Sequence, residues 1–353
     1  MNCCIECFRD AFIRETIEKY GSNGHCDFCE SGSGVVYDIS DPDNIISKNI
    51  IDLLQMYSIS DSAQAKPLIY ALCEDWDIFN LDEDAVLALT NALCVAEYPE
   101  NDDIFTKSVI ISQLANSDFL HEFGVARGYN WDEFSESIKY SNRFHNDMFN
   151  PEQFTSILSM LRNTYNVGAI MYRARISEGA KGFPKGKMGA PPRDKRSAGR
   201  VNPEGIGALY LSSDEPTVLN EVRASAFDYI TIGTFRAVRD INVVNLSGFG
   251  KTSPFLFSGE LEKFAANRQV FKEIAAEIAK PLRRGDSPLE YLPTQFISEY
   301  IKSLNYDGVA FDSTLREGGA NVAVFDESLF KCVKVRTVEV SKIKYRTRPE
   351  LKK

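Results

Sequence analysis

The chain has 353 residues, of which 44% are hydrophobic and 25% charged, and its formal net charge at pH 7 is −10. This composition is typical of a globular protein with enough apolar mass for a core. No run of 18 apolar residues occurs and the N-terminus is not that of a signal peptide, which argues against a membrane segment and secretion and for a cytoplasmic protein. The length favours two domains, or one domain with an appendage.

The charge is unevenly distributed along the chain. Residues 1–150 contain 9 Lys and Arg against 27 Asp and Glu, a balance of −18, whereas the remainder contains 31 against 23, a balance of +8. This split suggests that the basic half handles an anion and that the two halves attract each other. Two independently solvated surfaces are the alternative. We expect neither a nucleic acid nor a membrane among the partners.

Five of the eight cysteines lie in the first 30 residues. Four of them form two C-x2-C pairs separated by 18 residues: Cys4, Cys7, Cys26 and Cys29. This spacing predicts a four-thiolate zinc site, and four protein ligands leave no open position for catalysis, so the zinc is expected to be structural. Cys3 in place of Cys4, or His25 beside Cys26, is an alternative ligand, and disulfides are the alternative in a secreted chain.

Residues 31–150 are predicted to be mostly helical, with short polar or acidic stretches between the helices. Apolar residues at helical spacing place these helices at 45–57, 65–79, 82–97, 104–114 and 131–140. A linking helix is expected at 151–166. The first part of the chain is therefore predicted to be a zinc-binding element followed by an acidic helical domain.

The pattern changes after residue 167. Strands are predicted at 168–176, 208–212, 229–238, 241–246, 307–312, 321–325 and 331–340, with amphipathic helices at 260–279 and 289–304. In the first of these strands Arg173 and Arg175 alternate with their neighbours and therefore point to the same side. The whole chain is accordingly predicted to be α+β, with a mixed α/β domain after the helical region.

The stretch from 198 to 223, AGRVNPEGIGALYLSSDEPTVLNEVR, combines several features of a binding site. Arg200 and Asn202 lie among glycines and a proline, as expected of a loop that approaches a ligand closely. Tyr210 lies on the short strand that follows. Asp214 is a suitable N-cap for the next helix, which carries Glu221 beside its apolar stripe.

Two common kinds of site are not expected. The segment NLSGFGKTSP differs from a phosphate-binding loop because Asn245 replaces the first glycine and Pro254 interrupts the helix that such a loop requires. A nucleophilic Ser–His pair is also excluded from the second half, because all three histidines precede residue 150. The site must use other side chains.

The second half resembles the RES family, which is named for its arginine, glutamate and serine. The matching segments are the 198–223 stretch, MYRARI at 171–176, and YLPTQFISEYIKSLNYDGVAFDST followed by NVAVFD between 291 and 326. The helical region, including NWDEFSESIKYSNRF, is similar to the HEPN-like domains that accompany some RES domains. Active HEPN ribonucleases place an arginine shortly before a histidine, and neither His121 nor His145 has one at that distance, so ribonuclease activity is not expected.

The resemblance implies an ADP-ribosyltransferase-like fold that binds NAD in a cleft between small sheets. The implied catalytic residues are Glu221, Arg200, Tyr210 and Ser313, and the implied NAD-binding residues are Arg173, Tyr172, Asn202 and Asn321. The glutamate would stabilise positive charge on the ribose, the arginines would hold the pyrophosphate, and the tyrosine and serine would orient the nicotinamide side. Whether Arg173 or Arg175 faces the cleft is left open.

RES toxins are similar to enzymes that destroy NAD with inorganic phosphate or water. We therefore predict an NAD phosphorylase or NAD glycohydrolase that acts as a toxin or antiviral defence effector, with structural zinc, with NAD as substrate, and with phosphate or water as acceptor. A protein ADP-ribosyltransferase, or an inactive RES domain in a partner-binding protein, is the alternative. The expected partners are an antitoxin or regulatory protein, or the acidic N-terminal domain acting as an intramolecular restraint.

This interpretation divides the chain into five parts. They are a four-cysteine zinc element at 1–30, a helical acidic domain at 31–150, a linking helix at 151–170, a RES catalytic domain at 171–345, and a basic tail at 346–353.

Overall fold

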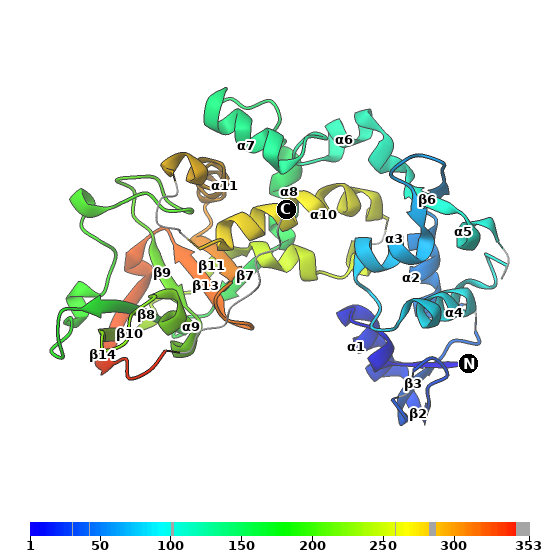
Figure 1. The fold of residues 1–353 in the computed structure, drawn as a ribbon, viewed down its shortest axis with the longest axis horizontal. Coiled ribbons are helices and arrows are strands. Elements are labelled where there is room, and N and C mark those ends of the chain that lie inside the picture. The colour runs from blue at the N-terminus through cyan, green and yellow to red at the C-terminus, as the bar shows by residue number, and fades with distance from the viewer. Residues whose placement is uncertain (30, 42, 100–101, 258, 282–286, 344–353) are drawn as a thin grey trace. The chain divides into compact units, whose positions relative to one another are not determined.

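The computed structural model describes residues 1–343 apart from 30, 42, 100–101, 258 and 282–286, so the predicted basic tail lies outside the described residues. The chain forms two compact units (Figure 1). Unit 1 comprises Met1–Gly128 and Lys251–Gln269, and unit 2 comprises Tyr129–Gly250 and Val270–Lys353. No helix in the described part of the chain is both long and apolar enough to cross a membrane.

Unit 1 begins with a small antiparallel sheet in the order β1-β3-β2. Its elements in chain order are β1 (Asn2–Cys4), the 3₁₀ turn η1 (Ile5–Cys7), α1 (Ala11–Tyr20), β2 (Ser22–His25) and β3 (Ser33–Asp38). The helix α1 begins at Asp10, whose side chain accepts a hydrogen bond from the Ile13 backbone N–H, and it buries Ile13 and Ile17. The strand β2 ends next to Cys26, and the sheet brings the second cysteine pair, Cys26 and Cys29, close to Cys4 and Cys7.

The rest of unit 1 packs helices around a second three-stranded sheet in the order β4-β6-β5. Its elements are α2 (Ile45–Leu54), β4 (Tyr57–Ile59), β5 (Lys66–Pro67), α3 (Leu68–Trp76), α4 (Glu83–Cys94), α5 (Asp103–Thr106), β6 (Ser108–Ile111) and α6 (Ser117–Phe123). The helix predicted at 104–114 is wrong beyond its first turn. Its run of β-branched residues, Val109 to Ile111, pairs as the central strand β6 and buries alternate side chains.

The segment Lys251–Gln269 belongs to unit 1. It includes the first part of α10 (Leu261–Ala279), which makes aromatic and polar contacts with other residues of unit 1. The Phe264 ring stacks on Trp76 with centroids 6.2 Å apart, and the Arg268 guanidinium lies over the same indole. Asn267 accepts a hydrogen bond from the Val125 backbone N–H at 2.7 Å. The remaining residues of α10 belong to unit 2.

Unit 2 is built on an eight-stranded mixed sheet in the order β14-β10-β8-β9-β13-β12-β11-β7 (Figure 1). In that order the strands are Phe330–Glu339, Tyr229–Ala237, Ile170–Ser177, Leu209–Ser212, Ala320–Val324, Gly308–Asp312, Ile241–Asn245 and Arg162–Tyr165. Neighbouring strands are antiparallel except β11 and β12, which are parallel. The α+β class is therefore confirmed, with a four-cysteine cluster in the N-terminal region.

Helices α8 (Pro151–Met160), α7 (Trp131–Tyr140) and α11 (Leu292–Ser303) meet at an aromatic cluster in unit 2. The Phe149 ring lies within 6.3 Å, centroid to centroid, of each ring in the set Phe134, Phe154, Phe296 and Tyr300. The linking helix predicted to reach residue 166 is wrong after Leu161. Residues Arg162–Tyr165 pair with β11 instead, so sheet hydrogen bonds replace the last helical turn.

The eight-stranded sheet is nearly divided between β8 and β9. These strands share a single residue pair, Tyr172 with Ser212, whereas β8 and β10 share eight. Beyond that one pair the two strands part. The break gives unit 2 two half-sheets, and both strands at the break carry predicted site residues.

Candidate active site

A cavity of about 540 Å³ lies where β8 and β9 separate. Its wall includes Arg173 from β8, Arg200 from the loop before β9, Tyr210 from β9 and Glu221 from α9 (Glu215–Glu221). The segment from Ile278 to Pro281, at and beyond the end of α10, completes one side. A cavity of this size is ample for a cofactor-sized ligand.

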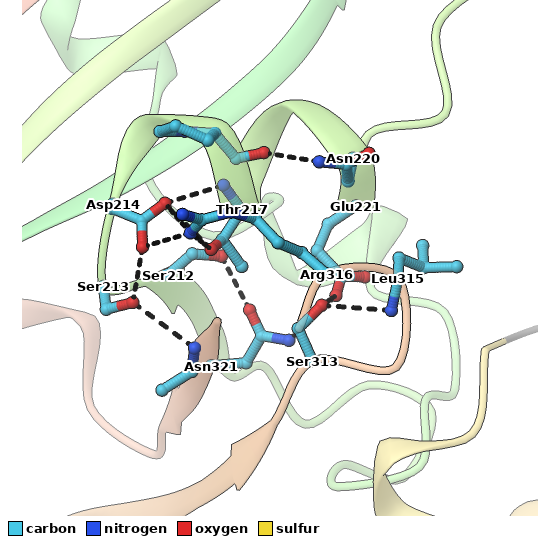
Figure 2. A network of polar contacts seen from close by, with 12 residues as sticks. Ser212, Ser213, Asp214, Thr217, Asn220, Glu221, Ser313, Leu315, Arg316 and Asn321 are labelled. Carbon is cyan, nitrogen blue, oxygen red and sulfur yellow. Dashed lines mark hydrogen bonds and ion pairs between the residues drawn. The ribbon is translucent and has the colours of Figure 1, made fainter. Parts of the chain in front are cut away.

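Glu221 is the last residue of α9, and one of its carboxylate oxygens is fixed by two hydrogen bonds. Its Oε1 accepts from Ser313 Oγ at 2.7 Å and from Asn321 Nδ2 at 2.9 Å (Figure 2). Asn321 is itself oriented by Ser212, whose hydroxyl donates to Asn321 Oδ1 at 2.7 Å. Among the described residues no group bonds Oε2. The carboxylate is therefore held by one oxygen while the other remains available to a ligand.

An ion pair joins the start of α9 to the turn that carries Ser313. Arg316 Nη1 donates to both carboxylate oxygens of Asp214 at 2.6 Å and to Thr217 Oγ1 at 2.8 Å (Figure 2). Asp214 is also the N-cap of α9, because it accepts from the Thr217 backbone N–H. The β12–β13 turn and the Glu221 helix are thus held together at two points, the Arg316 guanidinium and the Glu221 carboxylate.

These bonds also set the protonation of Asp214. Desolvation alone would raise its pKa, but hydrogen bonds from the Thr217 backbone and hydroxyl and from Arg316 outweigh it and lower the pKa to about 2. Asp214 is therefore ionised at neutral pH and can serve the guanidinium and the helix N-terminus together.

The two arginines of β8 share a side of the strand but have different surroundings. Arg173 lines the cavity, and its Nη1 is buried without a hydrogen-bond partner. Burial first, and then the neighbouring Arg175 cation, lower the pKa of Arg173 to about 10. Arg175 instead donates to the Lys187 carbonyl and lies over the Phe183 ring. Of the two, Arg173 faces the cavity.

Arg200 is buried in the cavity wall and already has partners. Its Nε donates to the Lys280 carbonyl at 2.8 Å, its Nη1 lies 3.5 Å from Glu277 Oε2, and its guanidinium is 5.3 Å from the centre of the Tyr291 ring. It therefore joins the loop before β9 to the end of α10.

Asn202 organises the same loop from within. Its Nδ2 donates to three carbonyls of residues 197–206, and its Oδ1 accepts from the Tyr210 hydroxyl at 2.8 Å. A Cβ at Gly199 would lie 2.8 Å from that Oδ1, so this close approach requires glycine. Gln295 of α11 donates to the carbonyls of Gly199 and Asn202. The loop is thus held from both sides.

Seven of the eight predicted site residues come together. Those that line the cavity are Arg173, Arg200, Asn202, Tyr210, Glu221 and Asn321, and Ser313 reaches the cavity through its bond to Glu221. Tyr172 does not belong to the cavity wall. It lies instead at the one residue pair, with Ser212, through which β8 still joins β9.

Sequence reasoning missed four residues that position this set: Ser212, Asp214, Arg316 and Gln295. Asp214 was recognised only as a helix cap. Gln295 lies inside the YLPTQF segment, which was the one available signal for it. Nothing in a single sequence marks Arg316 among 40 Lys and Arg residues.

The charges in the cavity wall are strongly unequal. Glu221 is the one carboxylate among the described lining residues, whereas five side chains there are cationic: Arg173, Arg196, Arg200, Arg223 and Lys280. Burial raises the pKa of Tyr210 to about 12, so its hydroxyl keeps its proton and donates to Asn202. The wall suits an anionic ligand with one position for developing positive charge.

A second site lies in unit 1. The sulfur atoms of Cys4, Cys7, Cys26 and Cys29 all lie within 4.8 Å of one another. Neighbouring sulfurs are 3.4–3.8 Å apart, close to the separation of about 3.8 Å that tetrahedral Zn–S bonds would give. Cys3 and His25 are not in the cluster. The predicted four cysteines therefore form a group able to hold a metal ion.

Comparison with known proteins identifies the family of unit 2. No curated protein matches the chain. One solved structure that matches is a chain of the MbcT–MbcA toxin–antitoxin complex of M. tuberculosis, at 13% identity and a TM-score of 0.31, over 53% of this chain and 92% of that one. The model of the RES domain matches residues 170–347, half of the chain. The chain belongs to the RES-domain family.

Proposed function

We propose that this protein cleaves the bond between nicotinamide and ribose in NAD. The observation that carries the proposal is the Glu221 carboxylate, which stands alone among the cavity's cations with one oxygen fixed. Cleavage of this bond develops positive charge on the ribose ring. A fixed carboxylate next to that ring stabilises the transition state more than the ground state.

A single carboxylate suits this reaction better than cleavage of an ordinary sugar–oxygen bond. Most glycoside hydrolases use two carboxyl groups: one protonates the leaving oxygen, and the other acts as nucleophile or as base on water. Nicotinamide needs no proton, since the pyridinium nitrogen takes the electron pair of the broken bond and leaves as a neutral molecule. The absence of a second acid, judged over the described lining residues, is therefore compatible with the proposed chemistry.

The remaining wall residues fit the rest of NAD. Arg173 offers an unpaired guanidinium N–H group to the pyrophosphate, with Arg200 close by in the loop before β9. Tyr210 offers a ring to the nicotinamide side. Ser313 and Asn321 hold the carboxylate and need not contact the substrate themselves.

The reaction also requires an acceptor that forms a new bond to the ribose carbon after nicotinamide leaves. Phosphate would form an oxygen bond to the ribose carbon and give ADP-ribose 1″-phosphate, while water would give ADP-ribose and release a proton. We propose that this loss of NAD makes the protein a toxin or defence effector, held in check by an antitoxin or by unit 1. We further propose that the four thiolates of unit 1 bind structural zinc, because their spacing suits that ion and they leave no open ligand position.

The test is the NAD concentration over time with purified protein, with and without phosphate. Glu221→Gln keeps an acceptor for Ser313 but removes the charge, so it should lower the rate about 10²-fold or more. The matched control is Glu204→Gln, which changes an exposed carboxylate outside the cavity wall and should leave the rate unchanged.

The pattern of NAD loss across the three proteins distinguishes the possible functions. NAD loss with wild-type protein and Glu204→Gln, but not Glu221→Gln, supports the proposal, and a requirement for phosphate identifies phosphorolysis. Transfer of labelled ADP-ribose to a protein, without free product, would favour the ADP-ribosyltransferase alternative. Equal rates in Glu221→Gln and wild type would rule out the assigned role of the carboxylate.

A further inference from the structure

Residues 182–190, called here the anchored segment, follow β8 and are held against the sheet of unit 2. They include the 3₁₀ turn η3 (Lys185–Lys187). Arg175 of β8 holds the segment at two points. Its Nη1 donates to the Lys187 carbonyl, and its guanidinium lies 4.4 Å from the centre of the Phe183 ring. Arg175 therefore spends its side chain on the segment, whereas Arg173, two residues earlier, lines the cavity.

The two strands beyond β8 hold the same segment. Thr231 of β10 pairs in register with Arg175, and its hydroxyl accepts a hydrogen bond from the Phe183 backbone N–H at 2.9 Å. Thr337 of β14 pairs in turn with Thr231, and a Cβ at Gly182 would lie 2.0 Å from the Thr337 Oγ1. Because Gly182 also has a φ of +63°, both its backbone and this close approach require glycine. The segment thus crosses one row of residues on β8, β10 and β14.

The far end of the segment is fixed by a buried side chain and a carboxylate. Met188 is fully buried in the core of unit 2. A Cβ at Gly233 of β10 would lie 3.3 Å from the Met188 Cε, so the glycine leaves the space that the methionine occupies. The Ala190 backbone N–H donates to Glu327 Oε2 at 2.7 Å. Both ends of the segment are therefore tied to the sheet domain.

The cavity wall continues directly from the anchored segment. Pro191 follows its last residue and lines the cavity, as do residues 196–198. The position of these wall residues therefore depends on where the segment is held. A wall that is already ordered binds a ligand more tightly, because the entropy of ordering it is not lost on binding.

We propose that Arg175 is a positioning residue, which holds the anchored segment on the sheet and so keeps this part of the cavity wall ordered for the substrate. The inference rests on the proposed function and adds a determinant of NAD binding. Arg175 does not touch the reacting atoms, so its loss should weaken substrate binding and leave the cleavage step nearly unchanged. The two arginines of β8 then divide the work: Arg173 lines the cavity, and Arg175 holds its wall.

Trypsin digestion of the full chain tests the anchor without any turnover. The peptide bond after Lys187 contains the carbonyl that Arg175 bonds, and the next residue, Met188, is buried, so cleavage there requires release of the segment. Arg175→Ala should speed cleavage at this bond about 10-fold, and Arg175→Lys, which keeps one donor, should speed it less. Arg236→Ala changes an exposed arginine of β10 and is the matched control. Mass spectrometry of the first fragments identifies the bond that is cut.

The rate of NAD loss over a range of NAD concentrations tests the effect on the cavity. Arg175→Ala should raise KM about 10-fold and change kcat less than about 2-fold. Phe183→Leu removes the ring beside the guanidinium but keeps the backbone bond to Thr231, so it should raise KM by less. In the Phe183→Leu background Arg175→Ala should have a smaller effect than alone, because the two residues share one contact. Arg236→Ala should change neither constant.

The two assays separate this inference from the function on which it rests. Cleavage of Arg175→Ala at the wild-type rate would overturn the anchor. Faster cleavage with an unchanged KM, or a fall in kcat alone, would overturn the positioning role. If Arg175→Ala is cut throughout the chain it is unfolded, and Arg175→Lys and Phe183→Leu then decide by the same measurements. A wild-type protein that consumes no NAD would overturn the proposed function, while the digestion still decides whether Arg175 holds the segment.

Discussion

The thiol cluster of unit 1 and the Glu221 site of unit 2 satisfy their polar atoms in opposite ways. In the cluster, four sulfur atoms face one another within 4.8 Å and come from 26 consecutive residues. In unit 2, one oxygen of Glu221 takes two hydrogen bonds from residues 92 and 100 positions away, and the other lies open to a ligand. The closed arrangement suits a structural ion and the open one suits a reaction.

The same difference explains how each site keeps its geometry. The thiols would depend on the proposed zinc ion, because a shared cation would hold four sulfurs together at this distance. Glu221 depends on the protein, through Ser313 and Asn321 and, one step further out, through Arg316 and Asp214. Substitutions in the thiol cluster should therefore lower the stability of unit 1, and substitutions at the contacts of Glu221 should lower the rate of NAD cleavage.

The largest effect is expected at the cluster. Cys4→Ser removes one of four ligands and should reduce bound zinc from one ion per chain to none, with local unfolding of the N-terminal element. Cys3→Ala changes an adjacent buried cysteine outside the cluster and should retain the ion. Metal analysis of the two purified variants measures this directly. Loss of zinc in Cys3→Ala alone would show that the ligand set has been assigned in the wrong register.

The same pair of variants tests the proposed restraint by unit 1. If unit 1 holds the enzyme in check, Cys4→Ser should consume NAD faster than wild type, and Cys3→Ala should not. Unchanged consumption in a Cys4→Ser protein that has lost its zinc would remove the restraint while leaving the catalytic proposal intact.

An intermediate effect is expected at the ion pair that joins the β12–β13 turn to α9. Arg316→Ala frees the turn that carries Ser313, so we expect kcat for NAD cleavage to fall about 10-fold with little change in KM. Arg316→Lys should recover part of the rate. Arg336→Ala removes a different contact of the same helix, with Glu215, and should leave kcat unchanged. A rise in KM with kcat unchanged would contradict a positioning role for Arg316.

The smallest effect concerns acid stability. Because the pKa of Asp214 is lowered to about 2, below its value in the unfolded chain, its ionised form stabilises the fold at neutral pH, and this contribution is lost as the pH falls from about 4 to 2. Asp214→Asn keeps the helix cap without the charge and should cost up to about 1 kcal/mol at pH 7, because the side chain is partly exposed. Urea unfolding of both proteins at pH 7 and pH 3 should show the difference shrinking.

Much of the local structure could be predicted from the sequence. The α7 helix at 131–140 and seven of the eight strands of unit 2 follow from apolar spacing, and seven residues named by the family signature lie at one cavity. The helix predicted at 104–114 is wrong because its β-branched residues pair in a sheet with Tyr57–Ile59 and Lys66–Pro67, which lie 41 to 54 residues earlier in the chain. The residues near position 110 give no sign of these distant pairing partners.

The site's supporting contacts were unpredictable for a related reason. Arg316 meets Asp214 across 102 residues, and Ser212 meets Asn321 across 109. Such pairs depend on strand order in the sheet, which one sequence does not reveal. The choice of Arg173 over Arg175 likewise required knowing where β8 and β9 part, because both side chains share one side of the strand.

Because Lys251–Gln269 belongs to unit 1, recombination between genes can exchange the two units only in a restricted way. Unit 2 is encoded in two separate stretches, with a piece of unit 1 inserted between them. One crossover between genes cannot exchange the catalytic unit whole, since either product would carry a mismatched α10. Relatives with different N-terminal halves should therefore be expected to differ at this inserted segment as well, so that the two change as a matched set.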